Sequence, residues 1–496
     1  MVVFDFTEPA RQSPKGILVI FGFKAFKFLK SFFILFVAYG ISLFQNNTIG
    51  ISPTVLGLGF VAFLVLLLIY AILNYLNFKF HVSADDFHLN TGILNKDNTI
   101  IPKSKIQNVY IKQNFLQQII NVVSLNIETA GDNKSEIEIS ALDKPTALAL
   151  KKQLFAREPL ADATKEITKE DEVFFRASLK RLLLEGVSQN HFKSFLIIAS
   201  FMVGLYSEFE KYLEKLQLSE RIEGAVNFDK QTLVNIFIFY LFIALLLLLV
   251  SLVFSVVKTL IVNFNLEVVE REHTLEINKG LFNKMSLTLT PSRIQNLVVK
   301  TNRVKAYFNL YGLNVMQAMV NKKQQKNFAM VAMEKEQLQH LIQKLLKTYS
   351  AATEKHKPAP YYKRILWLRL VVFFAILNLP AYFVFGTYFW MINIVFLCFA
   401  LLYVHVKFKK AHFQISAEHI SIGSGFIETV TNILEIHKIQ ALKLQQSIFQ
   451  KRNGIASVVI ATASKSVVIP YIKEAEANEI YNYLLFILES QDRDWM

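Results

Sequence analysis

The chain has 496 residues, of which 53% are hydrophobic, and it carries 54 Lys or Arg residues against 39 Asp or Glu residues. This length exceeds one ordinary hydrophobic core and predicts roughly three domain-sized units, and so apolar a composition excludes an ordinary soluble protein in favour of a membrane protein. The formal net charge of +15 is therefore read as a sign of membrane sidedness and not of nucleic-acid binding. The single cysteine, Cys398, excludes an intramolecular disulfide.

Long apolar segments dominate the chain, and they come in three pairs. Each is close to the length of a helix that crosses roughly 30 Å of hydrocarbon, the third being the shortest. In chain order the six segments are Phe26–Phe44, Thr54–Leu76, Phe192–Tyr206, Val234–Ile261, Ile365–Phe385 and Tyr388–Val406.

The charge distribution predicts how these hairpins are oriented. The connection "QNNTIGISP" in the first pair holds no charge, whereas the segments between pairs are rich in Lys and Arg. The positive-inside rule therefore predicts a multi-pass protein of the plasma (inner) membrane, with both termini and both inter-pair segments in the cytoplasm. The start of the chain, "MVVFDFTEPARQSPKG", is acidic and Pro-containing, unlike a secretory signal, so we expect it to be retained.

Two interpretations of the membrane segments remain open. Segments two, four and six have no Asp, Glu, Lys or Arg in their central stretches, which favours anchoring over a transport path. Asn378-Leu379-Pro380 predicts a helix kink in segment five, which serves either packing or gating.

The segments after each hairpin repeat one another without gaps. Offsets of 188 and 333 residues align about 40 residues of the first copy with the other two. Two gapless alignments that share the same residue types indicate three related units. The repeated positions, which we expect to be mainly structural, are Gly92, Ile106, Gln107, Ala130, Gly280, Ile294, Gln295, Ala318, Gly425, Ile439, Gln440 and Ala463.

Each unit has the local pattern of β-structure. Apolar residues alternate before the glycine, as in Phe87 and Leu89, and the glycine predicts a turn. The second strand has apolar residues at Ile106, Val109 and Ile111, and the jump of three predicts a bulge. Strands around 122–130 and 135–140 and a closing amphipathic helix follow, so the fold class is membrane α+β, with a small barrel or curved sheet in each unit.

At this point the chain resembles the bacterial membrane proteins with pleckstrin-homology-like (PH-like) domains. The resemblance rests on "GILNKDNTIIPKSKIQNVYIKQNFLQQIINVVSLNIETAG" and its two counterparts, and on the three-unit arrangement. It implies a seven-strand barrel with a C-terminal helix for each unit, so the expected architecture is six transmembrane helices as three hairpins, each followed by such a barrel in the cytoplasm. The expected units are 1–156, 157–350 and 351–496, with linkers "REPLADATKEITKEDE" and "SAATEKHKPAP" before the second and third hairpins. We expect "VFFRASLKRLLLEGVSQNHF" to lie along the membrane surface.

No catalytic signature is found in the sequence. HExxH, Walker, GxSxG and paired-Cys patterns are missing, so we expect neither an enzyme nor a cofactor. Histidines 81, 88, 273, 412 and 419 crowd near the first strands, but they do not fall on each other under the repeat offsets. A shared metal site would repeat its ligands, and we therefore predict none.

A basic residue, Ile and Gln recur in all three units, as in Lys105-Ile106-Gln107. On a strand the Ile points inward and its two neighbours outward. The pattern serves either contact with lipid headgroups or a partner, or maintenance of the fold at the bulge. The candidate contact residues are Lys103, Lys105, Lys112, Arg293, Lys300, Arg303, Lys305, Lys438, Lys451 and Arg452.

The resemblance favours a non-enzymatic scaffold or assembly protein whose barrels bind one another or other proteins near the bilayer. It implies a homo-oligomer, or a hetero-oligomer with a smaller one-hairpin PH-like protein, and a role in envelope stress or tolerance of membrane-active peptides. An anionic-lipid-binding sensor and a transporter of lipids or small molecules are the alternatives.

Overall fold

The computed structural model describes residues 5–44, 53–129, 136–155, 172–192, 194–202, 204, 233–271, 274–318, 325–347, 349, 354–386 and 389–490. These divide into two compact units. Unit 1 comprises residues up to Phe174 together with Glu267–Leu289, and unit 2 comprises Phe175–Leu266 together with Thr290–Met496. The boundary between the units therefore passes through the second repeat.

In its described residues, the first repeat, in unit 1, has seven strands in two sheets and a closing helix. A four-stranded antiparallel sheet has the order β1-β2-β3-β4, and β5-β6-β7 form the second layer. Phe80, Phe87, Leu125, Ile139 and Leu150 are fully buried between the two layers and the helix α4. The elements are β1 (Ala10–Arg11), β2 (Lys79–Val82), β3 (Asp86–Thr91), β4 (Asp97–Pro102), β5 (Ile106–Gln113), α3 (Phe115–Ile119), β6 (Val123–Thr129), β7 (Glu136–Leu142) and α4 (Lys144–Phe155).

The second repeat contributes strands to both units. In unit 1 its strands β9 (Glu267–Glu270), β10 (Leu275–Lys279) and β11 (Lys284–Leu289) are antiparallel neighbours. The strand β8 (Glu172–Arg176), which belongs to unit 1 as far as Phe174, lies beside β9. In unit 2 the second repeat supplies β12 (Ile294–Thr301), α9 (Arg303–Tyr307), β13 (Tyr311–Gln317), β14 (Ala329–Met333) and α10 (Lys335–Leu345).

The third repeat, in unit 2, encloses its own core. Two three-stranded layers pack around Phe413, Leu434, Ile460, Ile469 and Leu484. The elements are β15 (His412–Ile415), β16 (His419–Ser424), β17 (Thr429–Glu435), β18 (Ile439–Gln445), α13 (Ile448–Arg452), β19 (Ile455–Thr462), β20 (Ser466–Lys473) and α14 (Glu474–Ser490).

Local features recur at the same repeat positions, as the offsets predict. Gly92, Gly280 and Gly425 have φ of 99°, 109° and 124°, and a side chain there would collide with the carbonyl oxygen three residues later. The predicted bulge is confirmed in all three copies, because the pairing register shifts between Ile106 and Asn108 and at both equivalent places. Short 3₁₀ helices precede each bulge, at Lys103–Lys105, Pro291–Arg293 and Ile436–Lys438.

The hairpins are inserted into the domains, and this corrects the expectation that each barrel simply follows its hairpin. The strand β1 lies before the first hairpin in the chain but pairs with β2 after it, through Ala10 and Phe80. In the third repeat, the equivalent bridge joins His356 to Phe413. The segment 350–360, expected to be a linker, therefore supplies the position of the first strand in the third repeat. Most of the other expected linker, 156–171, lies outside the described residues.

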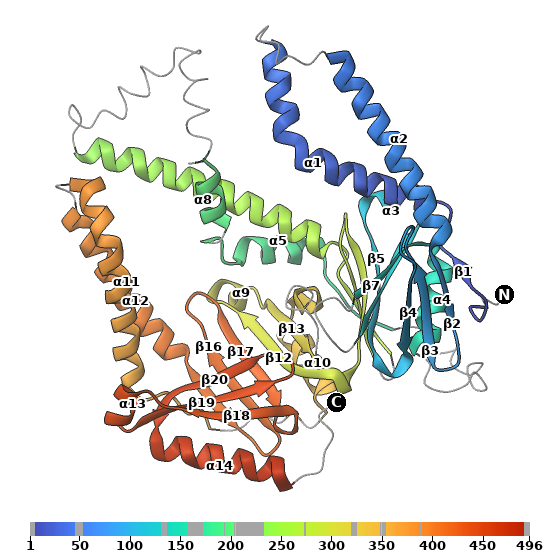
Figure 1. Ribbon diagram of the computed structural model, residues 1–496. Helices are drawn as coiled ribbons and strands as arrows, with labels where there is room; N and C mark the ends of the chain where they lie inside the picture. The colour runs from blue at the N-terminus through green and yellow to red at the C-terminus, as the bar shows by residue number, and fades with distance from the viewer. Residues whose placement is uncertain are drawn as a thin grey trace. The chain divides into compact units, whose positions relative to one another are not determined.

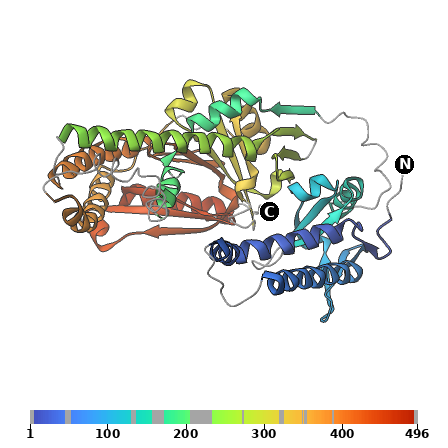
Figure 2. The same ribbon diagram turned by 90° about the horizontal axis from the view of Figure 1, so that it is seen from above.

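Long apolar helices form the hairpins. Within unit 1, α1 and α2 run side by side (Figure 2). The rings of Phe28 and Phe63 lie 4.0 Å apart between centroids. Within unit 2, the rings of Phe374 and Phe396 stack across the third hairpin at 3.7 Å. The helices are α1 (Gly16–Phe44), α2 (Pro53–Asn77), α8 (Leu233–Asn263), α11 (Tyr361–Phe385) and α12 (Phe389–Lys410).

Within the described part of the chain, two helices are long and apolar enough to cross a membrane, Thr54–Asn77 and Leu241–Asn263. Only 6% and 11% of their most apolar windows are buried within the protein. Such exposed apolar surface suits a hydrocarbon environment. Within the third predicted segment, residues 194–202 are helical, and 205–232 fall outside the described part of the chain.

Candidate functional site: joined strand edges and a buried polar lock

Consecutive repeats are joined by hydrogen-bonded strand edges. In unit 1, β11 of the second repeat pairs with β5 of the first, so that Met285 lies opposite Lys112. In unit 2, β17 of the third repeat lies beside β12 of the second (Figure 1). Their register sets Val430 opposite Lys300. Each repeat thus adds the edge of its first sheet to the second sheet of the repeat before it.

The two joints use the same register. Under the repeat offsets, Lys112 and Lys300 are equivalent, and so are Met285 and Val430. The neighbouring pairs agree as well, since Ser286 with Ile111 corresponds to Thr431 with Val299. Register is set by which side chains a strand must bury. The two joints share one register although their sequences differ. Pairing at these strand edges is therefore a property of the repeat fold.

Side chains reinforce the joint in unit 1. The Gln118 amide donates to the carbonyl oxygens of Leu281 and Phe282, both at 3.0 Å. The ring of Phe115 meets that of Phe282 edge-on, with centroids 6.0 Å apart. The turn between β10 and β11 is therefore held against the short helix α3 of the first repeat.

In unit 2 the joint contains buried polar groups. Asn432 lies opposite Val298, and its amide oxygen accepts from Lys465 Nζ at 2.6 Å and from the Asn296 amide at 3.3 Å. Burial, and to a smaller extent the charge of Lys300, lowers the pKa of Lys465. These contacts fix the register because a slip would leave buried polar groups without partners.

Lys438 corrects the expectation of an outward side chain beside the repeated Ile. It is 5% exposed, and its ammonium group donates to the Ile294 carbonyl oxygen and pairs with Glu435, both at 2.7 Å. Gln295 is likewise buried, at 1% exposure. Lys438 ends a short 3₁₀ helix and Gln295 lies within a bulge, so simple strand alternation predicts the direction of neither side chain.

The inward Ile of the repeated motif is placed as expected in all three copies, with exposures of 3%, 1% and 6% at Ile106, Ile294 and Ile439. Gln440 is exposed, Ala318 is buried and Ala463 is half-buried. Ala130 and the side chain of Gln107 lie outside the described part of the chain.

The candidate basic residues do not form one surface. Lys305 is buried like Lys438, while Lys103, Lys112 and Arg293 are half-buried. Lys103 donates to the Ala84 carbonyl oxygen at 2.9 Å, and Lys112 lies over the ring of Tyr110, 4.6 Å from its centroid. The exposed candidates are Lys105, Lys300, Arg303, Lys451 and Arg452.

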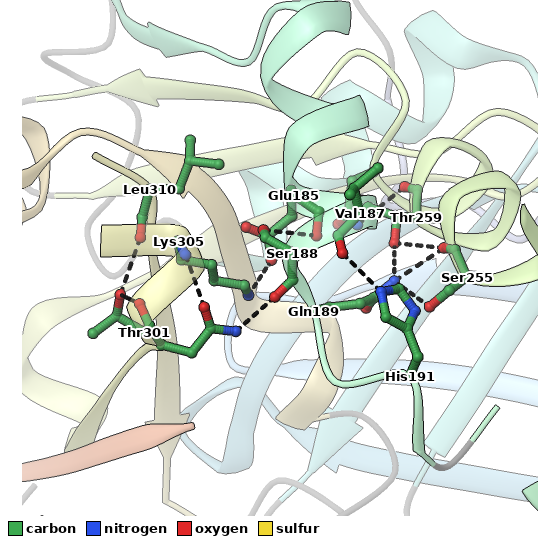
Figure 3. A network of polar contacts seen from close by, with 12 residues as sticks. Glu185, Val187, Ser188, Gln189, His191, Ser255, Thr259, Thr301, Lys305 and Leu310 are labelled. Atoms are coloured by element: carbon green, nitrogen blue, oxygen red, sulfur yellow. Dashed lines mark hydrogen bonds and ion pairs between the residues drawn. The ribbon is translucent and has the colours of Figure 1, made fainter. Parts of the chain in front are cut away.

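A buried ion pair in unit 2 links helix α5 (Leu179–Ser188) to the second repeat. Lys305 Nζ lies 2.5 Å from Glu185 Oε1, and the two side chains are 6% and 5% exposed (Figure 3). Asn302 caps α9 by accepting from the Lys305 backbone N–H, and its amide donates to the Ser188 carbonyl oxygen at 2.6 Å. Because a charge left alone there would cost several kcal/mol, both partners are needed.

The same helix is docked on the apolar helix α8. The Gln189 amide donates to Ser255 Oγ at 2.6 Å and to Thr259 Oγ1 at 2.7 Å (Figure 3). Four buried polar residues at a spacing of four line this side of α8: Ser251, Ser255, Thr259 and Asn263. At Gly186 an added Cβ would lie 2.8 Å from the Val256 Cα, so the helices meet closely. The segment expected on the membrane surface is thus a strand followed by a packed helix.

The histidine cluster is a cross-strand contact. His81 lies opposite His88, with their rings stacked 4.3 Å apart between centroids. Loss of hydration, and then the neighbouring His88, lowers the pKa of His81. Among the described residues no group of three or more His, Cys, Asp or Glu side chains is placed to hold a metal ion, and His273 lies outside them.

Comparison with known proteins agrees with this repeat structure. The bacterial PH domain family matches residues 29–158, 222–348 and 372–485. The chain is 23% identical over 480 residues to the UPF0699 transmembrane protein YdbT of Bacillus subtilis (strain 168), covering 93% of this chain and 94% of that protein. No solved structure matches the chain. With three matches across most of its length, the chain belongs to the bacterial PH domain family and is a membrane protein built from repeats of that domain.

Proposed function

We propose that the chain is a non-enzymatic scaffold that crosses the plasma membrane six times and holds three PH-like domains in the cytoplasm, where they assemble with other PH-like chains. The observation that carries this proposal is the joining of consecutive repeats through strand edges in one register. A domain that adds strands to its neighbour is already a protein-binding module.

The membrane arrangement is supported by several features. Helices α2 and α8 are apolar and little buried. The Bacillus subtilis protein YdbT, which is similar over 93% of this chain, is named a transmembrane protein. Basic residues end the third hairpin at Lys407, Lys409 and Lys410. Under the positive-inside rule, these residues favour the cytoplasmic side for the PH-like domains.

The scaffold proposal is tested by co-purification. Two differently tagged copies are expressed together, solubilised in a mild detergent, and one tag is captured. The expected result is that the second copy, or a smaller one-hairpin PH-like protein, is recovered in a fixed ratio. A chain that comes out alone, with no second PH-like protein, contradicts the proposal. Sensitivity to membrane-active peptides after gene deletion tests the proposed role in envelope stress.

A second candidate function, binding of anionic lipid, is favoured by the short helix α13. Ile448 and Phe449 are 87% and 76% exposed, beside the exposed cations Lys451 and Arg452. An apolar tip flanked by cations suits the interface of an anionic leaflet, where each cation near the surface contributes about 1 kcal/mol. Loss of binding to anionic vesicles in a Lys451→Glu/Arg452→Glu variant, with assembly unchanged, would favour this function.

A further inference from the structure

Among the described strands, one edge of each of the two kinds that form the internal joints has no partner, namely the outer edges of β4 and β18. Strand β4 is at the edge of its sheet, as are its equivalents β11 and β17 within their own repeats, but among the described residues β4 pairs only with β3 and has no strand on its outer side. Strand β18 is equivalent to β5 and β12, and it likewise ends its sheet within the described part of the chain. The first repeat thus leaves free the outer strand of its first sheet, β4, and the third repeat leaves free the outer strand of its second sheet, β18.

We propose that β18 of one copy pairs with β4 of a second copy, in the register of the two internal joints. This rests on the proposed scaffold function and names its partner and its contact. Carried over by the repeat offsets, the register sets Leu442 opposite Ile100, Lys443 opposite Thr99 and Gln445 opposite Asp97.

Burial differs between joined and free edges as this pairing requires. In the internal joint of unit 2, Leu297 and Ile433 lie opposite each other and are 0% and 3% exposed. Their counterparts at the free edges are Leu442, which is half-buried, and Ile100, which is 59% exposed. Pairing of the two copies would cover both side chains, and this apolar burial would add to the main-chain hydrogen bonds of strand addition.

A second contact independently matches the internal joint of unit 1. There Phe115 of α3 packs against Phe282 of the turn before β11. The equivalent residues at the free edges are Ile448 and Leu94, which are 87% and 96% exposed. They have the highest exposures among the large apolar side chains that the structure describes. The pairing of copies brings these two side chains together.

Charges at the free edges select this partner. Lys443 is exposed on β18, and a lysine on an edge strand opposes pairing with an arbitrary apolar strand. In the proposed register Asp97 lies diagonally across from Lys443 on the same face, which is an attractive placement. Lys105 is exposed, and its equivalent Lys438 donates across the internal joint to Ile294, so Lys105 is set to donate to Ile439 of the other copy.

Pairing of this kind is head-to-tail, since each copy offers a different edge to each neighbour. Such an interface closes into a ring or continues as a filament along the membrane. A second copy is the occupant that the chain itself specifies, because it carries both complementary edges.

The register is tested by disulfide cross-linking in membranes. Full-length chains with Cys398→Ala carry either Thr99→Cys and one tag or Lys443→Cys and another, and the two are expressed together. The expected product is a disulfide dimer that contains both tags. The control pairs Thr99→Cys with Leu442→Cys, which is one residue out of register and on the opposite face, and it should give little dimer. Equal cross-linking of both pairs, or of neither, overturns the proposed register.

The apolar contact is tested by Leu94→Asp, a change at an exposed side chain that should leave each copy folded. We expect the association of copies to weaken roughly tenfold, because a buried leucine is lost from the interface. Binding to anionic vesicles should be unchanged, since α13 is intact. Unchanged association, or loss of vesicle binding in parallel, would overturn the contact. If copies associate in the tagged capture but neither cross-link nor Leu94 dependence appears, the scaffold stands and this interface fails. A chain recovered alone defeats both.

Discussion

Lys305 shows how one residue at a repeated position changes the role of a short helix. The equivalent residues are Gln117 and Gln450, whose side chains accept from the backbone N–H of the helix cap in a capping box. Lysine has no acceptor, so in the second repeat the side chain turns to Glu185 instead. The repeat alignment identifies the unusual lysine, but nothing in the sequence pattern identifies its partner.

The first prediction concerns this buried pair. Lys305→Met leaves the Glu185 carboxylate buried without its cation, and we expect the free energy of unfolding to fall by about 3–5 kcal/mol. Thermal unfolding of the detergent-solubilised chain measures the loss. The double variant Glu185→Leu/Lys305→Met should recover most of it, and Arg303→Met, an exposed change in the same helix, should matter little. A single variant as stable as the parent would contradict the assigned role.

The second prediction compares two glycines of the third repeat. Gly425→Ala should destabilise the chain by more than about 1 kcal/mol, because its φ of 124° and the nearby Glu428 carbonyl oxygen leave no room for a Cβ. Gly454→Asn should be nearly neutral, since Asn121 and Asn309 adopt the same left-handed conformation at this position. Their Tm values in one detergent provide the comparison, and equal effects would be inconsistent with the repeat assignment.

The third prediction is a pH dependence. Burial lowers the pKa of Lys279 from 10.5 to about 8 in the folded chain. Between these values the unfolded chain binds more protons than the folded one, so the contribution of Lys279 to stability rises as pH rises. The Tm difference between the parent and Lys279→Met should therefore shift in favour of the parent from pH 7 to pH 9.5. The exposed Lys284→Met controls for removing a lysine from the next strand, and a difference that is constant with pH would be evidence against this effect.

At the scale of elements, the sequence predicts what is local. The glycine turns, the bulge after Ile106 and the strands β6 and β7 follow from alternation and spacing, which short-range contacts dictate. The strand before a hairpin cannot be predicted from local sequence. In the first repeat, Ala10 pairs with Phe80, and α1 and α2 lie between them in the chain. Strands of two residues carry no periodicity, and their pairing depends on tertiary structure.

The packing of α5 on α8 is also tertiary. From the sequence alone, the Ser and Thr residues of α8 resemble ordinary variation within an apolar helix. Their spacing of four is explained only by the hydrogen bonds that Gln189 donates to two of them. The fourth prediction is that Gly186→Leu, which adds a side chain against Val256, lowers stability by about 1–3 kcal/mol in thermal unfolding. Gly57→Leu in α2 is the matched control, because nothing lies within 4 Å of an added Cβ there. Equal tolerance of both changes would disprove close docking.

At the scale of the whole molecule, the repeats explain the edges. The sequence reveals three copies through their offsets, but the pairing of β5 with β11 and of β12 with β17 joins segments far apart in the chain. The basic residues expected to meet lipid are therefore divided among joints, a cation–π contact and exposed helices. Only contacts between distant segments could distinguish these roles, and composition carries no such information.

The fifth prediction concerns the assembled protein. If strand edges join copies as they join repeats, the unit in the membrane contains more than one PH-like chain, and Leu94→Asp lowers the number of chains per particle. Because Leu94 is 96% exposed, the variant removes little packing within one copy. Its Tm at low protein concentration should match that of the parent.

The most direct measurement is the native mass of the full-length chain released gently from the membrane, for the parent and for Leu94→Asp. A single chain has a mass of 57.0 kDa. The parent is expected at multiples of this mass, or at that mass plus a smaller PH-like chain, and the variant is expected to shift towards the single chain. A parent that appears only as a lone chain of 57.0 kDa would contradict the scaffold.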